Sequence, residues 1–303
     1  MKKLILLFAF VLSMQSISSQ KITFEIAPFV GFSFAKIDEL VYSNNIKESH
    51  IEGKNYKPFI GINSVFLMQN FMCDFTVQSC IPVALGIVTD KDFFISEQNP
   101  IAMFSEHNLI TDKDYLFELN LSYKFNLPVL NFGLGVSGIY SNTKMEAVDG
   151  YLQYPENHKE WTGNESKDFL NGTVISYEQS RFLAGMTIFM EKEFSCLSFL
   201  LKGSFYPFVS VECIDNHFLR SVQFLDSMKD GFSYSVKFNA NWKINKINSL
   251  FLNASFSYLT AEGNTFVNPL GIITSETKEV DKTCTVATNF YDLSFVLGFL
   301  IKI

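Results

Sequence analysis

Residues 115–125 read YLFELNLSYKF, and side chains of two kinds alternate along this stretch. Apolar residues occupy the odd positions, and from residue 118 onward polar residues occupy the even ones, namely Glu118, Asn120, Ser122 and Lys124. Because successive side chains of a β-strand point to opposite faces, the pattern predicts a strand with one apolar and one polar face. The same alternation covers residues 232–244 (FSYSVKFNANWKI) and residues 292–303.

These alternating runs are long for a soluble β-protein. Strands in soluble sheets are usually about 5–6 residues long, whereas a strand that crosses a bilayer needs about 9–11 residues. The composition agrees with a membrane wall, since the chain is 16% aromatic, contains 33 phenylalanines and is only 18% charged. The fold class expected is therefore all-β, in the form of a transmembrane β-barrel whose polar face lines a wet interior.

Ten such runs can be counted, at residues 21–35, 58–68, 71–87, 114–125, 129–141, 174–190, 195–211, 231–245, 248–260 and 289–303. Short connections alternate with long polar ones, which cover residues 36–57, 88–113, 142–173, 212–230 and 261–288. This predicts a ten-stranded antiparallel barrel with short periplasmic turns, five long extracellular loops and both termini on the periplasmic side. A soluble periplasmic β-protein is the alternative.

The first residues have the features of a secretory signal. Lys2 and Lys3 precede an apolar core at residues 4–12, and small serines follow it. We expect a signal peptide at residues 1–19, with the barrel at residues 20–303. Export of a barrel places the protein in the bacterial outer membrane.

The charge and the cysteine content limit the kinds of partner and metal that we expect the chain to bind. The net charge of −7 and the isoelectric point near 5.2 argue against a nucleic-acid partner. The five cysteines are an odd number without metal-like spacing, so we expect neither a disulfide framework nor a metal site built from them.

Two short motifs stand out where polar segments follow the third and seventh runs. VTDKDFF (residues 88–94) contains Asp90 and Asp92, and CIDNHF (residues 213–218) contains Asp215 and His217. In a ten-stranded ring these strands are four apart, so both pairs belong to nearly opposite sides of the extracellular mouth.

The expected facing of the two motifs differs. Asp90 and Asp92 share the polar face of their run. Strict alternation from Leu201 turns Asp215 and His217 outward, unless Pro207 in SFYPFVS marks a bulge that resets the register.

The two pairs together have the chemistry of a hydrolytic site. A carboxylate orients a histidine, which takes a proton from water, while two neighbouring carboxylates cannot both ionise easily, so that one holds a proton. No metal or cofactor is required. Solvated loop charges are the alternative for each motif alone, and a divalent metal site is another. Two positions are open to His107, which lies in the same segment as Asp90: close to the mouth, or solvated in the loop, and we expect the second.

The chain resembles the omptins, the barrel proteases of Gram-negative outer membranes. Asp90-Lys91-Asp92-Phe93 is similar to the family's D-x-D-W, and Asp215-Asn216-His217 is similar to its D-x-H. Further stretches match in order along most of the mature chain, namely ELVY at residues 39–42, GYLQYP from Gly150, KDGFSYSV from Lys229 and AEGNT from Ala261.

The resemblance implies an aspartic-type endopeptidase that cleaves exposed polypeptides at basic residues, with its site facing outward. Asp215 and His217 would activate water, with Asp90 and Asp92 facing them. Glu39 would form an acidic wall of the pocket for the basic side chain, where Cys213 replaces a second family aspartate and Glu212 or Asp215 is a candidate to compensate. Arg181 would bind lipopolysaccharide, a lipid that the resemblance links to activity.

Two rival functions remain open. Loss of the pocket aspartate at Cys213 favours a barrel that is catalytically weak or inactive and serves as an adhesin or surface receptor. A small porin is the other rival, although side chains usually fill the lumen of a ten-stranded barrel.

Overall fold

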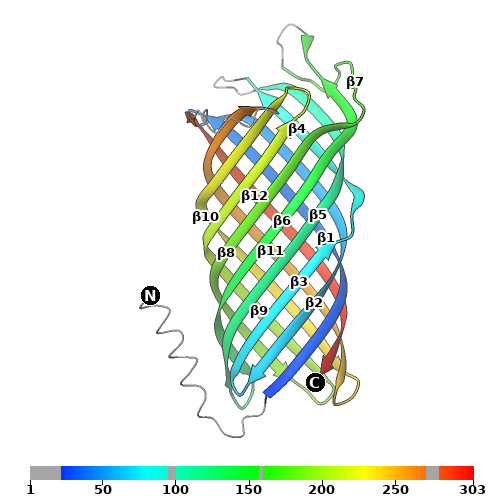
Figure 1. The fold of residues 1–303 in the computed structure, drawn as a ribbon, viewed down its shortest axis with the longest axis vertical. Helices are drawn as coiled ribbons and strands as arrows, with labels where there is room; N and C mark the ends of the chain where they lie inside the picture. The colour runs from blue at the N-terminus through cyan, green and yellow to red at the C-terminus, as the bar shows by residue number, and fades with distance from the viewer. Residues whose placement is uncertain (1–21, 95–97, 99, 157–159, 271–279) are drawn as a thin grey trace.

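The computed structural model describes residues 22–94, 98, 100–156, 160–270 and 280–303, so the signal peptide expected at residues 1–19 lies outside the described part. Long tilted strands form a single barrel (Figure 1). The strands are β1 (Ile22–Ser43), β2 (Ile46–Met68), β3 (Phe71–Cys80), β4 (Val83–Phe93), β5 (Ile101–Asn126), β6 (Asn131–Gln153), β7 (Asp168–Phe169), β8 (Thr173–Glu193), β9 (Leu197–His217), β10 (Val222–Lys243), β11 (Asn248–Pro269) and β12 (Val280–Lys302).

Every neighbouring pair of strands is antiparallel, and the ring closes where β1 pairs with β12. β3 and β4 follow one another along β2 and β5 and so occupy one position, while β7 is a two-residue addition to β6. Twelve strands therefore fill ten positions, and the expected ten-stranded barrel is confirmed. We call the end where β1 begins and β12 ends, which also has the short turns, the base, and the opposite end the mouth.

An apolar belt surrounds the half of the barrel nearer the base. On β5 the exposed side chains are Phe117, Leu119, Leu121, Tyr123 and Phe125. β5 has 26 residues, more than twice the 9–11 or so that cross a bilayer, so the strands continue well beyond the belt toward the mouth. The long polar segments expected as loops are therefore largely strand, and residues 36–57 form a hairpin that turns at Asn44 and Asn45.

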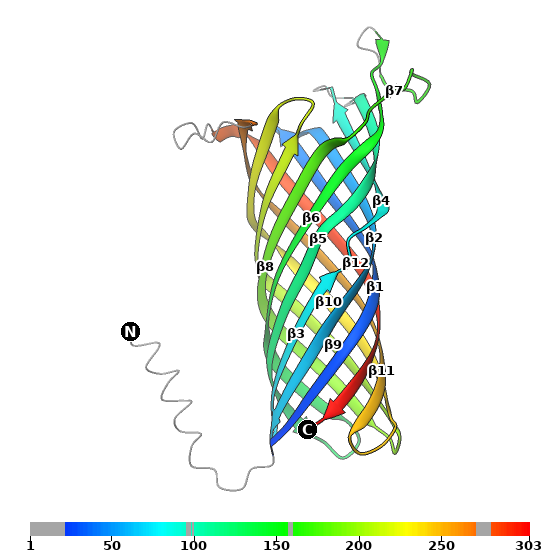
Figure 2. The ribbon, with the colours of Figure 1, turned by 45° about the vertical axis from the view of Figure 1, so that its right-hand side comes forward.

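The mouth carries less irregular chain than the sequence suggests, but β7 and the chain around it project beyond the barrel wall (Figure 2). No helix suited to crossing a membrane occurs in residues 22–94, 98, 100–156, 160–270 and 280–303.

Two irregularities lie in the strands that carry the two motifs. Pro82, which has no N–H for the sheet, separates β3 from β4, yet the same alternation continues from Thr76 to Asp90. In β9 an extra residue at Tyr206–Pro207 shifts the register against β8. The bulge expected at Pro207 is confirmed, and it turns Asp215 and His217 inward.

The interior is divided into two regions. A polar cavity of about 430 Å³ occupies the base and contains Glu118, Lys202 and Lys237. Above it, Arg181 stacks on the ring of Phe290 at 3.9 Å and bonds to Ser141 and Thr143, in a layer that also contains the buried ion pair of Lys57 with Asp114. Side chains therefore fill the lumen between the base cavity and the mouth, as expected for a narrow barrel.

Candidate functional site

Asp215 and His217 form a hydrogen-bonded pair on β9. They stand two residues apart on one face, and both side chains are buried. His217 Nε2 donates to Asp215 Oδ2 over 2.7 Å, which fixes the orientation of the ring. Phe224 supports the ring edge-on, with the ring centroids 5.3 Å apart.

The protonated form of His217 is favoured. Burial alone lowers the pKa of His217, but the hydrogen bond and charge of Asp215, together with the charge of Asp90, raise it above its ordinary value. A neutral imidazole with a raised pKa is a stronger base, so His217 is suited to taking a proton from water.

Asp90 and Asp92 face the dyad from β4. Asp90 is buried, and its Oδ1 has no hydrogen-bond partner among the described residues. Burial, and next the charge of Asp92, raise the pKa of Asp90 to about 6, while the charges of His217 and Arg220 oppose this rise. A carboxyl group with this pKa can hold a proton or release one near neutral pH.

A cavity of about 280 Å³ lies between the two pairs. Its lining comes from β1, β2, β4, β9, β10 and the β9–β10 turn, and it includes Glu39, Asp92, Asp215, His217, Arg220 and Phe224. The structure therefore brings together the two motifs, which are more than a hundred residues apart in the sequence, and it places Glu39 beside them. Each motif uses alternate residues of one strand, which is why both of its side chains point the same way.

Arg220 was not singled out by the sequence analysis. It lies in the turn between β9 and β10 and forms an ion pair with Asp92 across the mouth. It is the one cation in the segment that follows the D-x-H motif up to β10, which was the available signal. The pair ties the turn to the wall that carries Asp90 and Asp92.

The floor of this cavity is acidic. Glu39 from β1, Cys213 from β9 and Asp226 from β10 are all buried, and their ligand atoms lie within 4.8 Å of one another. Cys213 Sγ contacts the Tyr177 hydroxyl at 3.2 Å, and Gln179 Nε2 donates to it at 3.5 Å. Burial raises the pKa of the Cys213 thiol well above its usual value, so the group is a neutral thiol and not a nucleophile.

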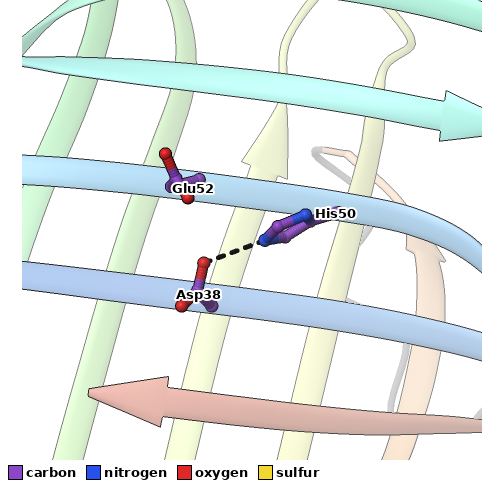
Figure 3. Close-up of side chains that lie close together, drawn as sticks. All are labelled: Asp38, His50 and Glu52. Atoms are coloured by element: carbon purple, nitrogen blue, oxygen red, sulfur yellow. Dashed lines mark hydrogen bonds and ion pairs between the residues drawn. The ribbon is translucent and has the colours of Figure 1, made fainter. Parts of the chain in front are cut away.

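Two residue sets in the described part of the chain have the density of a metal site. Glu39, Cys213 and Asp226 form one set. Asp38, His50 and Glu52 form the other, and His50 Nε2 lies 2.9 Å from Asp38 Oδ1 (Figure 3). Lys36 lies within 3.0 Å of both carboxylates of this second set, so a cation already neutralises it.

Three expectations about individual residues were wrong. Arg181 is only 5% exposed and points into the barrel, because Phe182 occupies the outward position; it is therefore not a lipid contact. Glu212 points outward and accepts a hydrogen bond from Ser227, so it cannot compensate for Cys213. His107 is 2% exposed, and not solvated.

His107 belongs to the wall of the site. Its Nε2 lies 2.9 Å from the hydroxyl of Ser105, and Ser105 pairs directly with Asp90 across β4 and β5. Burial lowers the pKa of His107, which favours the neutral ring. A bulge between Thr111 and Lys113 shifts the inward-facing positions of β5 from even to odd numbers, and this is why His107 faces inward.

Comparisons with known proteins agree with this architecture. The sequence profile of the Omptin family matches residues 20–297. The crystal structure of the outer membrane protease OmpT from Escherichia coli is similar, with a TM-score of 0.84 and 16% identity, over 95% of this chain and 99% of that one. The outer membrane protein OprG from Pseudomonas aeruginosa gives a TM-score of 0.40 at 7% identity, over 94% and 98% of the two chains.

No curated protein matches the sequence. The structural likeness at 16% identity shows a shared fold, whereas the profile match extends over most of the chain and shows the family. The chain therefore belongs to the omptin family of outer-membrane proteases.

Proposed function

We propose that the protein is an endopeptidase in which water attacks the peptide carbonyl directly. The observation that carries the proposal is the cavity lined by Asp215, His217 and Asp92, with the buried carboxylate of Asp90 two residues from Asp92 on the same face of β4. Oδ1 of Asp90 and Oδ1 of Asp215 both lack a hydrogen-bond partner among the described residues, as expected of groups that serve a water molecule or a substrate.

The reaction begins with deprotonation of water. His217 Nδ1 takes a proton from a water molecule, Asp215 stabilises the imidazolium, and the hydroxide oxygen bonds to the carbonyl carbon. The carbonyl oxygen becomes an oxyanion. Arg220 lines the cavity with a side chain that is 40% exposed, and its positive charge would stabilise this oxyanion.

Collapse of the intermediate completes hydrolysis. The C–N bond breaks, the nitrogen receives a proton from Asp90 or from the imidazolium, and a carboxylic acid and an amine leave the site. Burial and the charge of Asp92 keep Asp90 protonated at higher pH than an isolated aspartate would be. All the groups needed are side chains of this chain, so no cofactor or metal has a step in the mechanism.

The substrates are exposed polypeptides, and the mouth faces the exterior of the cell. Support comes from the position of the apolar belt nearer the base, because the mouth then stands clear of the membrane. Lipopolysaccharide is the proposed lipid partner. Lys113 and Lys144 point outward beside Tyr115 and Tyr140, just beyond the belt, where lipid phosphates would lie.

Cleavage of a mixed peptide library tests the proposal. The protein is refolded in detergent with lipopolysaccharide, alongside His217→Ala and Asp90→Ala variants that keep the same heat-modifiable gel shift. Loss of the general base should reduce kcat about 10²–10⁴-fold. Activity of the parent should rise with pH as His217 loses its proton, above the ordinary histidine pKa of about 6.5. If neither the folded parent nor the two variants cleave any peptide, the result would contradict the proposal and favour a binding surface.

A further inference from the structure

The acidic floor below the dyad contains a residue that the sequence resemblance does not assign. Asp226 lies on β10 directly opposite Cys213 on β9. Side chains at paired positions of antiparallel strands have Cβ atoms about 4.5–5.5 Å apart on the same face. A carboxylate at 226 can therefore reach the space that a carboxylate at 213 would occupy.

Asp226 and Glu39 are poorly compensated by their surroundings. Asp226 is 3% exposed, and neither of its oxygens has a hydrogen-bond partner among the described residues. The Thr265 hydroxyl lies close to Asp226 but does not adopt hydrogen-bond geometry. Glu39 is 4% exposed, and its Oε2 also lacks a partner. A buried carboxylate oxygen without a hydrogen-bond donor costs folding free energy. Such oxygens are typical of groups that bind a ligand.

The ligand that suits this arrangement is a cation on a flexible stem. Glu39 lines the cavity, whereas Asp226 and Cys213 each lie one inward-facing position deeper than cavity residues Phe224 and Asp215. A side chain that enters past the dyad would therefore end between Glu39 and Asp226. Planar guanidinium groups bind carboxylates with several hydrogen bonds, and they lose little hydration on burial.

We infer that Asp226, with Glu39, binds the guanidinium or ammonium group of a basic substrate residue next to the cleaved bond. The inference rests on the proposed peptidase function and names a residue of this chain that sets its specificity. The acidic partner that the resemblance places at position 213 has moved across the β9–β10 pair to position 226, and the neutral thiol of Cys213 fills the vacated place. Asp226 acts on specificity and does not touch the reacting atoms.

The test compares two peptides that differ only at the residue before the cleaved bond, one with arginine and one with citrulline. Citrulline has nearly the shape of arginine and no charge. We expect the parent to prefer arginine by about 100-fold in kcat/KM, as for other desolvated charge pairs. Asp226→Asn should reduce this ratio to a few-fold, by lowering kcat/KM for the arginine peptide far more than for the citrulline peptide.

Two further variants sharpen the test. Glu212→Gln removes the same charge from the outward face of β9, beside Cys213, and should leave the ratio at the parent value. Cys213→Asp combined with Asp226→Asn moves the carboxylate back across the strand pair and should restore the preference to within about tenfold of the parent.

The outcomes separate this inference from the peptidase proposal. A parent that cleaves peptides but does not discriminate arginine from citrulline would overturn the inference and leave the peptidase function standing. An Asp226→Asn variant with the parent's ratio would remove Asp226 from the pocket. If the double variant has the same low arginine-to-citrulline ratio as Asp226→Asn, a carboxylate at position 213 does not replace one at position 226. This result would also overturn the inference. A silent parent would overturn both proposals.

Discussion

The two ends of the barrel interior differ in how their buried charges are paired. In the base cavity, Glu118 accepts hydrogen bonds from Lys202 at 3.0 Å and Asn120 at 2.8 Å, and Lys237 lies 3.6 Å away. At the mouth, oxygens of four buried carboxylates have no hydrogen-bond partner among the described residues: Glu39, Asp90, Asp215 and Asp226. The first region is close to neutral, and the second carries excess negative charge.

This contrast separates a structural region from a functional one. Paired charges in the base satisfy one another and hold the strands of a wet lumen together. Unpaired carboxylates at the mouth destabilise the folded state, because desolvation raises the pKa of Asp226 to about 7 and that of Glu39 well above its usual value. Such a cost is typical of sites where ligand binding or catalysis uses the uncompensated charge.

The largest expected loss of stability is at the base. Glu118→Gln leaves Lys202 and Lys237 without their main counter-charge, and we expect a loss of about 3 kcal/mol in the free energy of unfolding. Urea unfolding in lipid measures it. Glu25→Gln is the matched control, since its partner Lys302 is half-exposed and the loss should stay below about 1 kcal/mol. Equal losses would mean that the base charges are not a buried network.

At the mouth, removing the charge of a buried carboxylate should increase the free energy of unfolding and not decrease it. The folded-state pKa of Asp226 is raised to about 7 from 3.8, so the unfolded chain releases this proton at lower pH than the folded one. Stability therefore falls as pH rises from about 4 to about 7, and the cost is complete above that range.

Asp226→Asn should remove this pH dependence and stabilise the barrel by roughly 2–4 kcal/mol above pH 7, measured by urea unfolding across that range. Destabilisation at high pH would show that a partner compensates Asp226, and the contrast between the two ends would fail.

The smallest expected effect concerns the dyad itself. Asp90→Asn removes a negative charge and should lower the pKa of His217, whereas Arg220→Gln removes a positive charge and should raise it by a smaller amount. NMR titration of the His217 ring, one of four histidines, follows both changes. Shifts of the same sign in the two variants would show that Asp90 and Arg220 do not act on His217 through their charges.

Much of the fold was predictable, because period-two alternation is a local property of each strand. The runs at 114–125 and 231–245 coincide with the membrane halves of β5 and β10. The long polar segments were less predictable. They are strands in which both faces can be polar beyond the membrane, so the loss of apolar residues was read as the end of the strand.

The candidate site was predictable where two residues of one strand made a recognisable pair. Asp90 with Asp92 and Asp215 with His217 are of this kind. Asp226 and Arg220 were missed because each is a single charge whose meaning depends on its neighbours in space. Arg181 was misassigned because a shift of one residue along a strand moves a side chain from the lipid to the interior.

The sequence by itself determined that this chain is an exported β-barrel with two acidic motifs, because alternation and short motifs are local properties of the sequence. Only the tertiary structure decided how the strands are registered. The bulge at Tyr206–Pro207 turns Asp215 and His217 inward, and the pairing of β9 with β10 sets Asp226 beside Cys213. Register depends on the strand opposite, which no single strand specifies, and in a closed barrel it fixes which charges meet across the axis.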